Sequence, residues 1–263
     1  MENQFSLDES TRNAYLNALD IQQWRTRDSH SEDTAEEVDQ PQTIVAAKTV
    51  RQPKSKTIET VEVEPVVDPI AKIDVDRISR MDLSSLELHV RGCDACDLHK
   101  TRKQTVFGIG HHKADWLIIG EAPGADEDRE GEPFVGRAGQ LLTQMLRAIG
   151  LAREEVFIAN ILKCRPPNNR DPKPEEVSAC SAYLNRQIQL LEPKIILALG
   201  RTAAQSLLQS DVPIGKMRGK LYHLKTNNIP TVVTYHPAYL LRSPKEKRKV
   251  WEDLKFARQQ IIS

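Results

Sequence analysis

The chain has 263 residues, 39% of them hydrophobic, and its 37 basic and 37 acidic side chains give a formal net charge of zero. No apolar run approaches the roughly 20 residues of a membrane-spanning helix and no signal peptide is visible, so we expect a soluble cytoplasmic protein with one good domain and no membrane contact. The charge is uneven, because residues 1–80 carry 10 Lys/Arg and 16 Asp/Glu, whereas residues 81–263 carry 27 and 21. The basic C-terminal part favours a polyanionic partner.

Two segments precede the expected globular domain. Within residues 1–27, Leu16, Leu19 and Trp24 recur at approximately helical spacing, which is typical of an amphipathic docking peptide; a helix that packs back on the domain is the alternative. Residues 28–80 are rich in polar residues and proline and cannot bury enough apolar surface to offset the entropy of ordering. We therefore predict a flexible, disordered linker there and a globular domain over residues 81–263.

Four cysteines follow, and they come from distant segments. Cys93 and Cys96 form a CxxC pair, whereas Cys164 and Cys180 lie 16 positions apart. In a reducing compartment such thiols are more plausible as metal ligands than as disulfides. The wide second spacing does not match zinc templates, whereas four thiolates can hold an iron–sulfur cluster. A zinc site and unligated core cysteines remain the alternatives.

From residue 82 onward, strand-like and helix-like segments alternate. A short helix is expected over Leu83–Val90, capped by Ser84 or Ser85. Short apolar runs predict buried strands at 116–119, 156–161, 195–199 and 231–235. Longer helical patterns occupy 138–149, 174–191, 202–208 and 245–261. This alternation predicts an α/β fold: a three-layer α/β/α sandwich with a central, mainly parallel four-stranded sheet, whose functional loops follow the carboxyl ends of the strands.

Those loops contain the unusual residues. Gly120 to Gly124 and then Phe134 follow the first strand, Asn160 ends the second, and His236 follows the last. Singly, each has an ordinary explanation as a turn, cap or core residue. Together, at one end of successive strands, an aromatic ring, an amide and an imidazole are typical of a pocket that reads a nucleic-acid base.

Four motifs in order, GEAPGADED, GRAGQLL, NILKCRPPNNR and HPAYLLR, resemble those of the family 4 uracil-DNA glycosylases. The resemblance covers roughly residues 92–257. It implies a uracil-DNA glycosylase-like fold and a monofunctional hydrolase that removes uracil from DNA in base excision repair, leaving an abasic site. It also implies a structural [4Fe–4S] cluster whose ligands are Cys93, Cys96, Cys164 and Cys180.

The same resemblance assigns roles in the pocket. Phe134 would stack on the flipped uracil, Asn160 would pair with its N3/O4 edge, and His236 would donate to O2, where the charge of the leaving group accumulates. Gly120 and Ala122 would lie against the base. Related glycosylases place an Asp or Asn where Ala122 stands, and an alanine cannot orient water.

We expect a neighbouring carboxylate to position that water. Glu121 is the favoured candidate and Glu127 the second, and Glu127 is also a candidate for excluding the methyl group of thymine.

Further residues are predicted to contact DNA. Leu240 aligns with the wedge that fills the gap left by a flipped base, and Arg242 can reach a phosphate. The loop after the second strand would present Arg165, Asn169 and Arg170 to phosphates. Basic residues at 245–249 either extend this surface or form a solvated helix start.

The order LxxLxIxxW in residues 15–27 weakly resembles the N-terminal peptide of the psi subunit of bacterial DNA polymerase III, which binds the clamp loader. Two hypotheses follow: a uracil-excising enzyme, or a catalytically inactive module of the same fold that binds the clamp loader. The complete set of pocket residues favours the enzyme. We expect a bacterial, nucleoid-associated protein, and a monomer by default.

Overall fold

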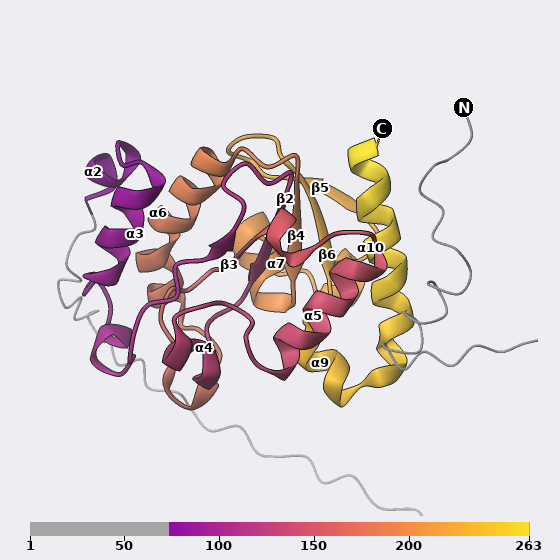
Figure 1. The fold of residues 1–263 in the computed structure, drawn as a ribbon, viewed down its shortest axis with the longest axis horizontal. Coiled ribbons are helices and arrows are strands. Elements are labelled where there is room, and N and C mark those ends of the chain that lie inside the picture. The colour runs from indigo at the N-terminus through magenta and orange to yellow at the C-terminus, as the bar shows by residue number, and fades with distance from the viewer. Residues whose placement is uncertain (1–73, 263) are drawn as a thin grey trace, which may run out of the picture. The chain divides into compact units, whose positions relative to one another are not determined.

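The computed structural model describes residues 74–262, which build a six-stranded sheet in the order β1-β3-β2-β4-β6-β5 (Figure 1). The four central strands run parallel, and the two edge strands pair antiparallel. The strands are β1 (Ile109–Gly110), β2 (Trp116–Gly120), β3 (Phe157–Asn160), β4 (Ile195–Leu199), β5 (Leu221–His223) and β6 (Pro230–Thr234).

The predicted sandwich and its four parallel strands are confirmed, but the sheet is wider than the four strands expected. The two edge strands have only two and three residues, too few to show an alternating pattern. The main chain of β1 lies very close to that of the segment leading into β3, since a Cβ on Gly110 would lie 1.9 Å from the Val156 carbonyl oxygen. Only glycine fits there.

Helices cover both faces of the sheet (Figure 1). They are α2 (Val75–Ser79), α3 (Leu83–Arg91), α4 (Ala125–Glu130), α5 (Arg137–Ala148), α6 (Pro174–Leu191), α7 (Arg201–Leu208), α8 (Ile214–Met217), α9 (Pro237–Arg242) and α10 (Lys247–Ile262). Short 3-10 turns lie at Asp97–Lys100, Arg153–Glu155, Pro167–Asn169 and Pro244–Glu246.

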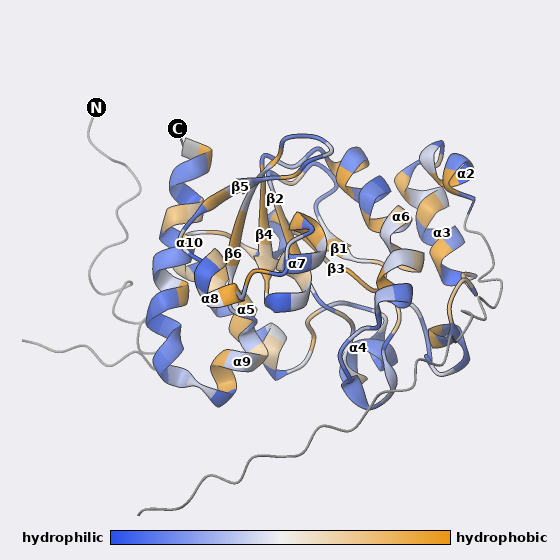
Figure 2. Cartoon of the chain, turned by 180° about the vertical axis from the view of Figure 1, so that it is seen from behind, coloured by the Kyte–Doolittle hydropathy of each residue, from blue (hydrophilic) through white to orange (hydrophobic). Residues whose placement is uncertain are grey.

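Alternation along the strands creates two cores. Leu117 and Ile119 of β2 pack with α3, α6 and α7, whereas Trp116 and Ile118 pack with α5, α9 and α10. Successive strand side chains point to opposite faces, so these buried strands are apolar throughout. Figure 2 shows this as a mainly orange sheet between helices with extensive hydrophilic surface.

The start of the domain differs from the prediction. Helix α2 falls within the segment predicted as linker, and its Ile78 is buried against the core, so the ordered domain begins before residue 81. The cap of α3 is Asp82, whose Oδ1 accepts from Ser85 N at 2.7 Å, and not Ser84 or Ser85. The predicted docking peptide and the rest of the predicted linker lie outside the described residues.

None of the helices between residues 74 and 262 has the length and apolar character needed to cross a membrane.

Candidate active site

The loops that carry the predicted site meet at the carboxyl ends of the parallel strands. The register pairs Gly120 of β2 with Asn160 of β3, so these two residues lie side by side at the carboxyl ends of their strands. Gly200 follows β4 and His236 follows β6 at the same end of the sheet. In both views, α4 and α9 lie at this end of the sheet (Figures 1 and 2). Parallel strands thus gather residues that are distant in sequence.

A cavity of about 430 Å³ opens at this end of the sheet. Its size is in the range of small-ligand sites. Most of the predicted site residues line it: Glu121, Ala122, Glu127, Phe134, Asn160, Asn169, Arg170, His236 and Arg242.

Gly120 lets the side chains of Asn160 and Phe134 approach the end of β2. A Cβ on this residue would lie 2.4 Å from Asn160 Oδ1 and 2.6 Å from Phe134 Cζ. Asn160 is 2% exposed, and its Oδ1 has no hydrogen-bond partner within residues 74–262. A buried acceptor without a partner is unfavourable, and a ligand N–H at this point would satisfy it.

The loop that carries Phe134 is held in an unusual conformation. Phe134 has φ 57°, in the left-handed region that a bulky side chain rarely adopts. Helix α5 approaches so closely that a Cβ on Gly139 would lie 1.7 Å from the Phe134 carbonyl oxygen. On the other side, Arg153 Nη2 donates to the Pro133 carbonyl at 2.5 Å. The main chain that carries the ring is therefore held in place by α5 and Arg153.

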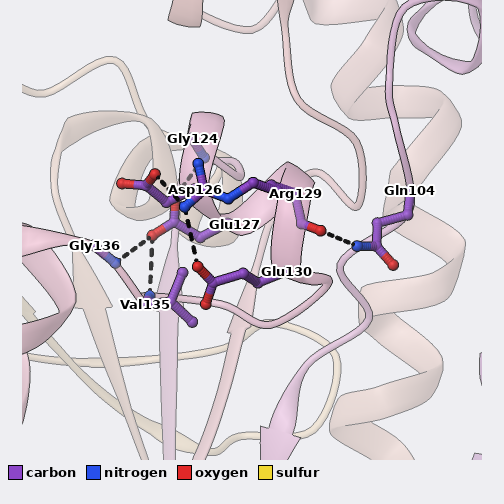
Figure 3. A network of polar contacts seen from close by, with 8 residues as sticks. All are labelled: Gln104, Gly124, Asp126, Glu127, Arg129, Glu130, Val135 and Gly136. Atoms are coloured by element: carbon purple, nitrogen blue, oxygen red, sulfur yellow. Dashed lines mark hydrogen bonds and ion pairs between the residues drawn. The ribbon is translucent and has the colours of Figure 1, made fainter.

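Glu127 ties this loop to α4 (Figure 3). Its Oε1 accepts from Val135 N at 3.1 Å and from Gly136 N at 3.2 Å, while its Oε2 accepts from Gly124 N at 3.0 Å. Both oxygens are thus engaged by the main chain, which argues against the predicted role of Glu127 in activating water. The carboxylate instead fixes the loop ahead of α5.

His236 is oriented as a hydrogen-bond donor toward the cavity. It is the N-cap of α9, and its Nδ1 accepts from Ala238 N at 3.1 Å. The proton of a neutral imidazole then resides on Nε2. Burial, with a smaller effect of the Arg242 charge, lowers the pKa of His236 to about 4, so the ring is neutral at pH 7. Its plane stacks on Phe134 with centroids 5.5 Å apart.

Glu121 is the other carboxylate at the cavity. Burial raises its pKa, and nearby Asp171 adds to this, while a hydrogen bond with Thr202 and the charge of Arg201 oppose the shift. The sequence did not identify Thr202 as a site residue. It lies in the first turn of α7, which begins directly after Gly200 and is distant in sequence from Glu121.

The loop after β3 is braced internally. Arg165 Nε donates to Asn169 Oδ1 at 2.8 Å. The predicted phosphate ligand Arg170 forms a two-point ion pair with Glu176, with N–O distances of 2.5 and 2.9 Å. The Glu176 side chain is 4% exposed, and the pair lowers its pKa. Arg170 therefore joins the loop to α6 and is less free to bind phosphate than predicted.

The structure contradicts the wedge assignment. Leu240 is 1% exposed and packs in the core beside α5 and α10, so it cannot enter DNA from this position. The exposed apolar residues of α9 are Tyr239 and Leu241, at 36% and 38%. Sequence alone could not separate Leu240 from Leu241, because the helical phase of the HPAYLLR loop was unknown.

The four cysteines form no disulfide and line one pocket, together with Tyr183, Arg102 and Lys163. Two donors reach sulfur: Arg102 Nη1 to Cys164 Sγ at 3.1 Å and Lys163 N to Cys180 Sγ at 3.3 Å. Burial raises the pKa of Cys164 to about 11 and that of Cys180 to about 12. Within residues 74–262, no three His, Cys, Asp or Glu side chains converge closely enough to hold a single metal ion.

Comparison with known proteins agrees with this geometry. The family model described as "Uracil DNA glycosylase superfamily" matches residues 107–255. The type-4 uracil-DNA glycosylase of Archaeoglobus fulgidus is 46% identical over 179 residues, which are 66% of this chain and 90% of that protein. The type-4 enzyme of Thermotoga maritima is 45% identical over 175 residues, 65% and 91% of the two chains. A type-5 uracil-DNA glycosylase of Thermus thermophilus is 36% identical over 118 residues, 39% and 53% of the two chains.

Proposed function

Since this chain belongs to the uracil DNA glycosylase superfamily and, within it, to the type-4 uracil-DNA glycosylases, we propose that it hydrolyses the N-glycosidic bond of uracil in DNA and leaves an abasic site. The observation that carries the proposal is the meeting of Phe134, Asn160 and His236 at one cavity, with the amide oxygen of Asn160 unpaired among the described residues.

Recognition would use a base turned out of the helix. The Phe134 ring supplies a flat apolar surface for stacking, and Asn160 Oδ1 would accept from uracil N3–H. Cytosine carries no proton on its N3, so it would leave this buried oxygen unpaired. The amide of Asn160 would therefore favour binding of uracil over binding of cytosine.

His236 would stabilise the departing base. When the bond between C1′ and N1 breaks, its electron pair goes to the uracil ring and negative charge accumulates on O2. A neutral imidazole with its proton on Nε2 can donate to that oxygen. A donor fixed in advance in such a site is worth about 3–4 kcal/mol of barrier reduction, by analogy with oxyanion holes.

The nucleophile would be a water held by Glu121. Its oxygen forms the new bond to C1′, and its proton passes to the carboxylate and then to solvent. Glu121 lines the cavity and is braced by Thr202, whereas Ala122 has no polar group. Nearby negative charge would also favour the positive charge that develops on the sugar.

Contacts to DNA would come from both sides of the cavity. Arg242 of α9 is exposed and lines it, and Arg165 and Asn169 lie on the loop after β3. In place of Leu240, we propose Leu241 and Tyr239 as the apolar side chains that meet the DNA.

We further propose that the cysteine pocket holds a [4Fe–4S] cluster. A cluster binds each thiolate to a different iron, so its four sulfurs need not converge on one point as they do in a zinc site. The two N–H donors aimed at Cys164 and Cys180 are the kind of hydrogen bond that stabilises anionic sulfur. When bound, the cluster would supply a cross-link between the segment before β1, the loop after β3, and α6.

The inactive-module hypothesis is not favoured, because the likeness to type-4 enzymes extends over most of their length and the pocket residues are intact. The clamp-loader contact through residues 15–27 lies outside the described residues and stays a prediction, as do the nucleoid location and the monomeric state.

The test is a single-turnover incubation of anaerobically purified protein with an oligonucleotide that contains one deoxyuridine, followed by alkaline cleavage of abasic sites. We expect cleavage that requires uracil and disappears with His236→Ala. No cleavage by protein with a full complement of iron would overturn the proposal, whereas equal cleavage of a control strand with cytosine at the same position would remove the assigned selectivity.

A further inference from the structure

Lys163 is a buried lysine that lies between the two pockets described above. It follows β3, precedes Cys164, and is only 1% exposed. A lysine is almost never fully buried, since its ammonium loses hydration that the protein must replace. The partners of this side chain therefore indicate what it does.

Its contacts reach both pockets. The ammonium Nζ of Lys163 donates a hydrogen bond to the main-chain carbonyl oxygen of Asn160 at 2.9 Å. The main-chain N–H of Lys163 donates to Cys180 Sγ at 3.3 Å, and its carbonyl accepts from Val106 N at 2.8 Å. The main chain is thus anchored at the cysteine pocket while the side chain turns back to the base-reading residue.

Asn160 depends on such an anchor. Its Oδ1 has no hydrogen-bond partner in the described part of the chain, so no hydrogen bond to this oxygen fixes the direction of the amide. The register between β2 and β3 ends at the Gly120–Asn160 pair, and main-chain hydrogen bonds from Ile161 N to the Gly120 carbonyl and from Leu162 N to the Glu121 carbonyl follow it, each at 3.0 Å. A hydrogen bond from a charged donor to its carbonyl restrains the peptide at the point where recognition requires it.

We infer that Lys163 is a positioning residue for uracil recognition. Its ammonium holds the main-chain carbonyl of Asn160, while its own main-chain N–H is bound to the Cys180 sulfur. This inference rests on the proposed function of Asn160. It predicts that the lysine affects base recognition through Asn160 and not through the cysteine pocket.

The first test is Lys163→Met, which keeps an unbranched chain in the core and removes the donor. The main-chain N–H to Cys180 remains, so iron content should be unchanged. We expect the dissociation constant for free uracil to rise about tenfold and the single-turnover excision rate to fall by at least as much, as for a lost hydrogen bond from a charged donor. Leu254→Ala, a buried substitution in α10, is the matched control, which should lower stability but leave uracil affinity unchanged.

The second test is a double-mutant cycle with Asn160→Ala. If Lys163 acts through Asn160, the double variant should excise uracil no more slowly than Asn160→Ala alone. Additive losses, or a normal uracil affinity in Lys163→Met, would overturn the inference. Lys163→Gln keeps an N–H donor and should recover part of the affinity; if neither variant folds, Lys163 is a stability residue and the inference is wrong. Excision by the unaltered protein reports separately on the proposed function.

Discussion

His236 owes its chemistry to a protonation state that the fold imposes. A histidine in water has a pKa of about 6.5, and burial here lowers it to about 4. The folded protein therefore holds the neutral ring through the pH range in which a free imidazole would already be charged. The unfolded chain takes up that proton first, so the contribution of this residue to stability is complete above pH 6.5 and is lost progressively as the pH falls toward about 4.

The part of the excision rate that depends on His236 should accordingly be level from about pH 8 down to about pH 5 and should fall near pH 4, where His236 gains its proton. Protonation of Glu121, whose pKa is raised by burial, adds an acid limb of its own. Single-turnover rates across this range measure the effect. The His236→Gln variant keeps an N–H donor that does not titrate, so any acid limb that survives in it belongs to another group. A limb with a midpoint near 6.5 that is present in the unaltered protein and absent from His236→Gln would contradict the assignment.

Gly120 acts through the absence of a side chain. Gly120→Ala would place a methyl group 2.4 Å from Asn160 Oδ1 and 2.6 Å from Phe134 Cζ, so at least one of these groups must move. We expect excision to slow by about 10²-fold, the loss that small misplacements in a site can cause, while DNA binding is retained. Gly215→Ala in α8 is the matched control, since its added Cβ would meet only the Tyr235 hydroxyl at 3.8 Å. Equal rates for the two variants would refute the role of Gly120.

At the scale of elements, Glu127 joins α4 to the turn that begins α5 (Figure 3). Glu127→Ala removes the acceptor of three main-chain N–H groups, and each hydrogen bond to a charged group is worth about 1.5–3 kcal/mol. Because these groups are only half-buried and water can replace part of the loss, we expect the free energy of unfolding to fall by about 2–4 kcal/mol, less than the sum of the three. We also expect faster amide hydrogen exchange over residues 131–137. Glu130→Ala on the same helix removes only an exposed ion pair with Arg129 and should change neither quantity. Unaltered exchange in Glu127→Ala would show that the turn does not need this carboxylate.

The strands were predictable where burial produces a continuous apolar run, and the edge strands were not. Trp116–Ile119 and Ile195–Leu199 are buried on both faces, so the sequence marks them clearly. Strand β1 has two residues and depends on Gly110 approaching a neighbouring carbonyl, which no local pattern records. The order of the parallel strands then places Asn160 and His236 at one end of the sheet, as expected for functional loops.

What could not be predicted is how each side chain is used. An aromatic ring, an amide and an imidazole at Phe134, Asn160 and His236 were enough to indicate a base pocket. The role of Glu127 was not predictable, because its Oε1 binds main-chain N–H groups eight and nine positions further along the chain. The burial of Leu240 depends on the start of α9 at Pro237. Lys163 was read only as part of the NILKCRPPNNR motif, since a single lysine gives no sign that it will be buried.

At the scale of the whole molecule, the cysteine pocket links the segment before β1 to the loop after β3 and to α6. Cys164→Ser should abolish iron binding and the brown absorbance of an iron–sulfur protein and should lower the midpoint of thermal unfolding, because one of four thiolates is lost. Iron analysis and calorimetry of anaerobic protein measure both. Ser181→Ala, next to Cys180 in α6, should change neither. Full iron content in Cys164→Ser would exclude this residue as a ligand.

The acidic N-terminal part should modulate DNA binding without taking part in catalysis. Every residue assigned to the pocket lies within residues 74–262, so deletion of residues 1–73 should leave single-turnover excision on a short oligonucleotide within about twofold, a change worth less than 0.5 kcal/mol. The deleted segment carries 8 Lys/Arg and 14 Asp/Glu, so the remaining chain is positively charged. Its affinity for DNA without uracil should rise at low salt, with the difference fading as ions screen the charges. Titrations at several salt concentrations measure this change. Loss of excision or of iron on truncation would show that the deleted segment belongs to the catalytic domain.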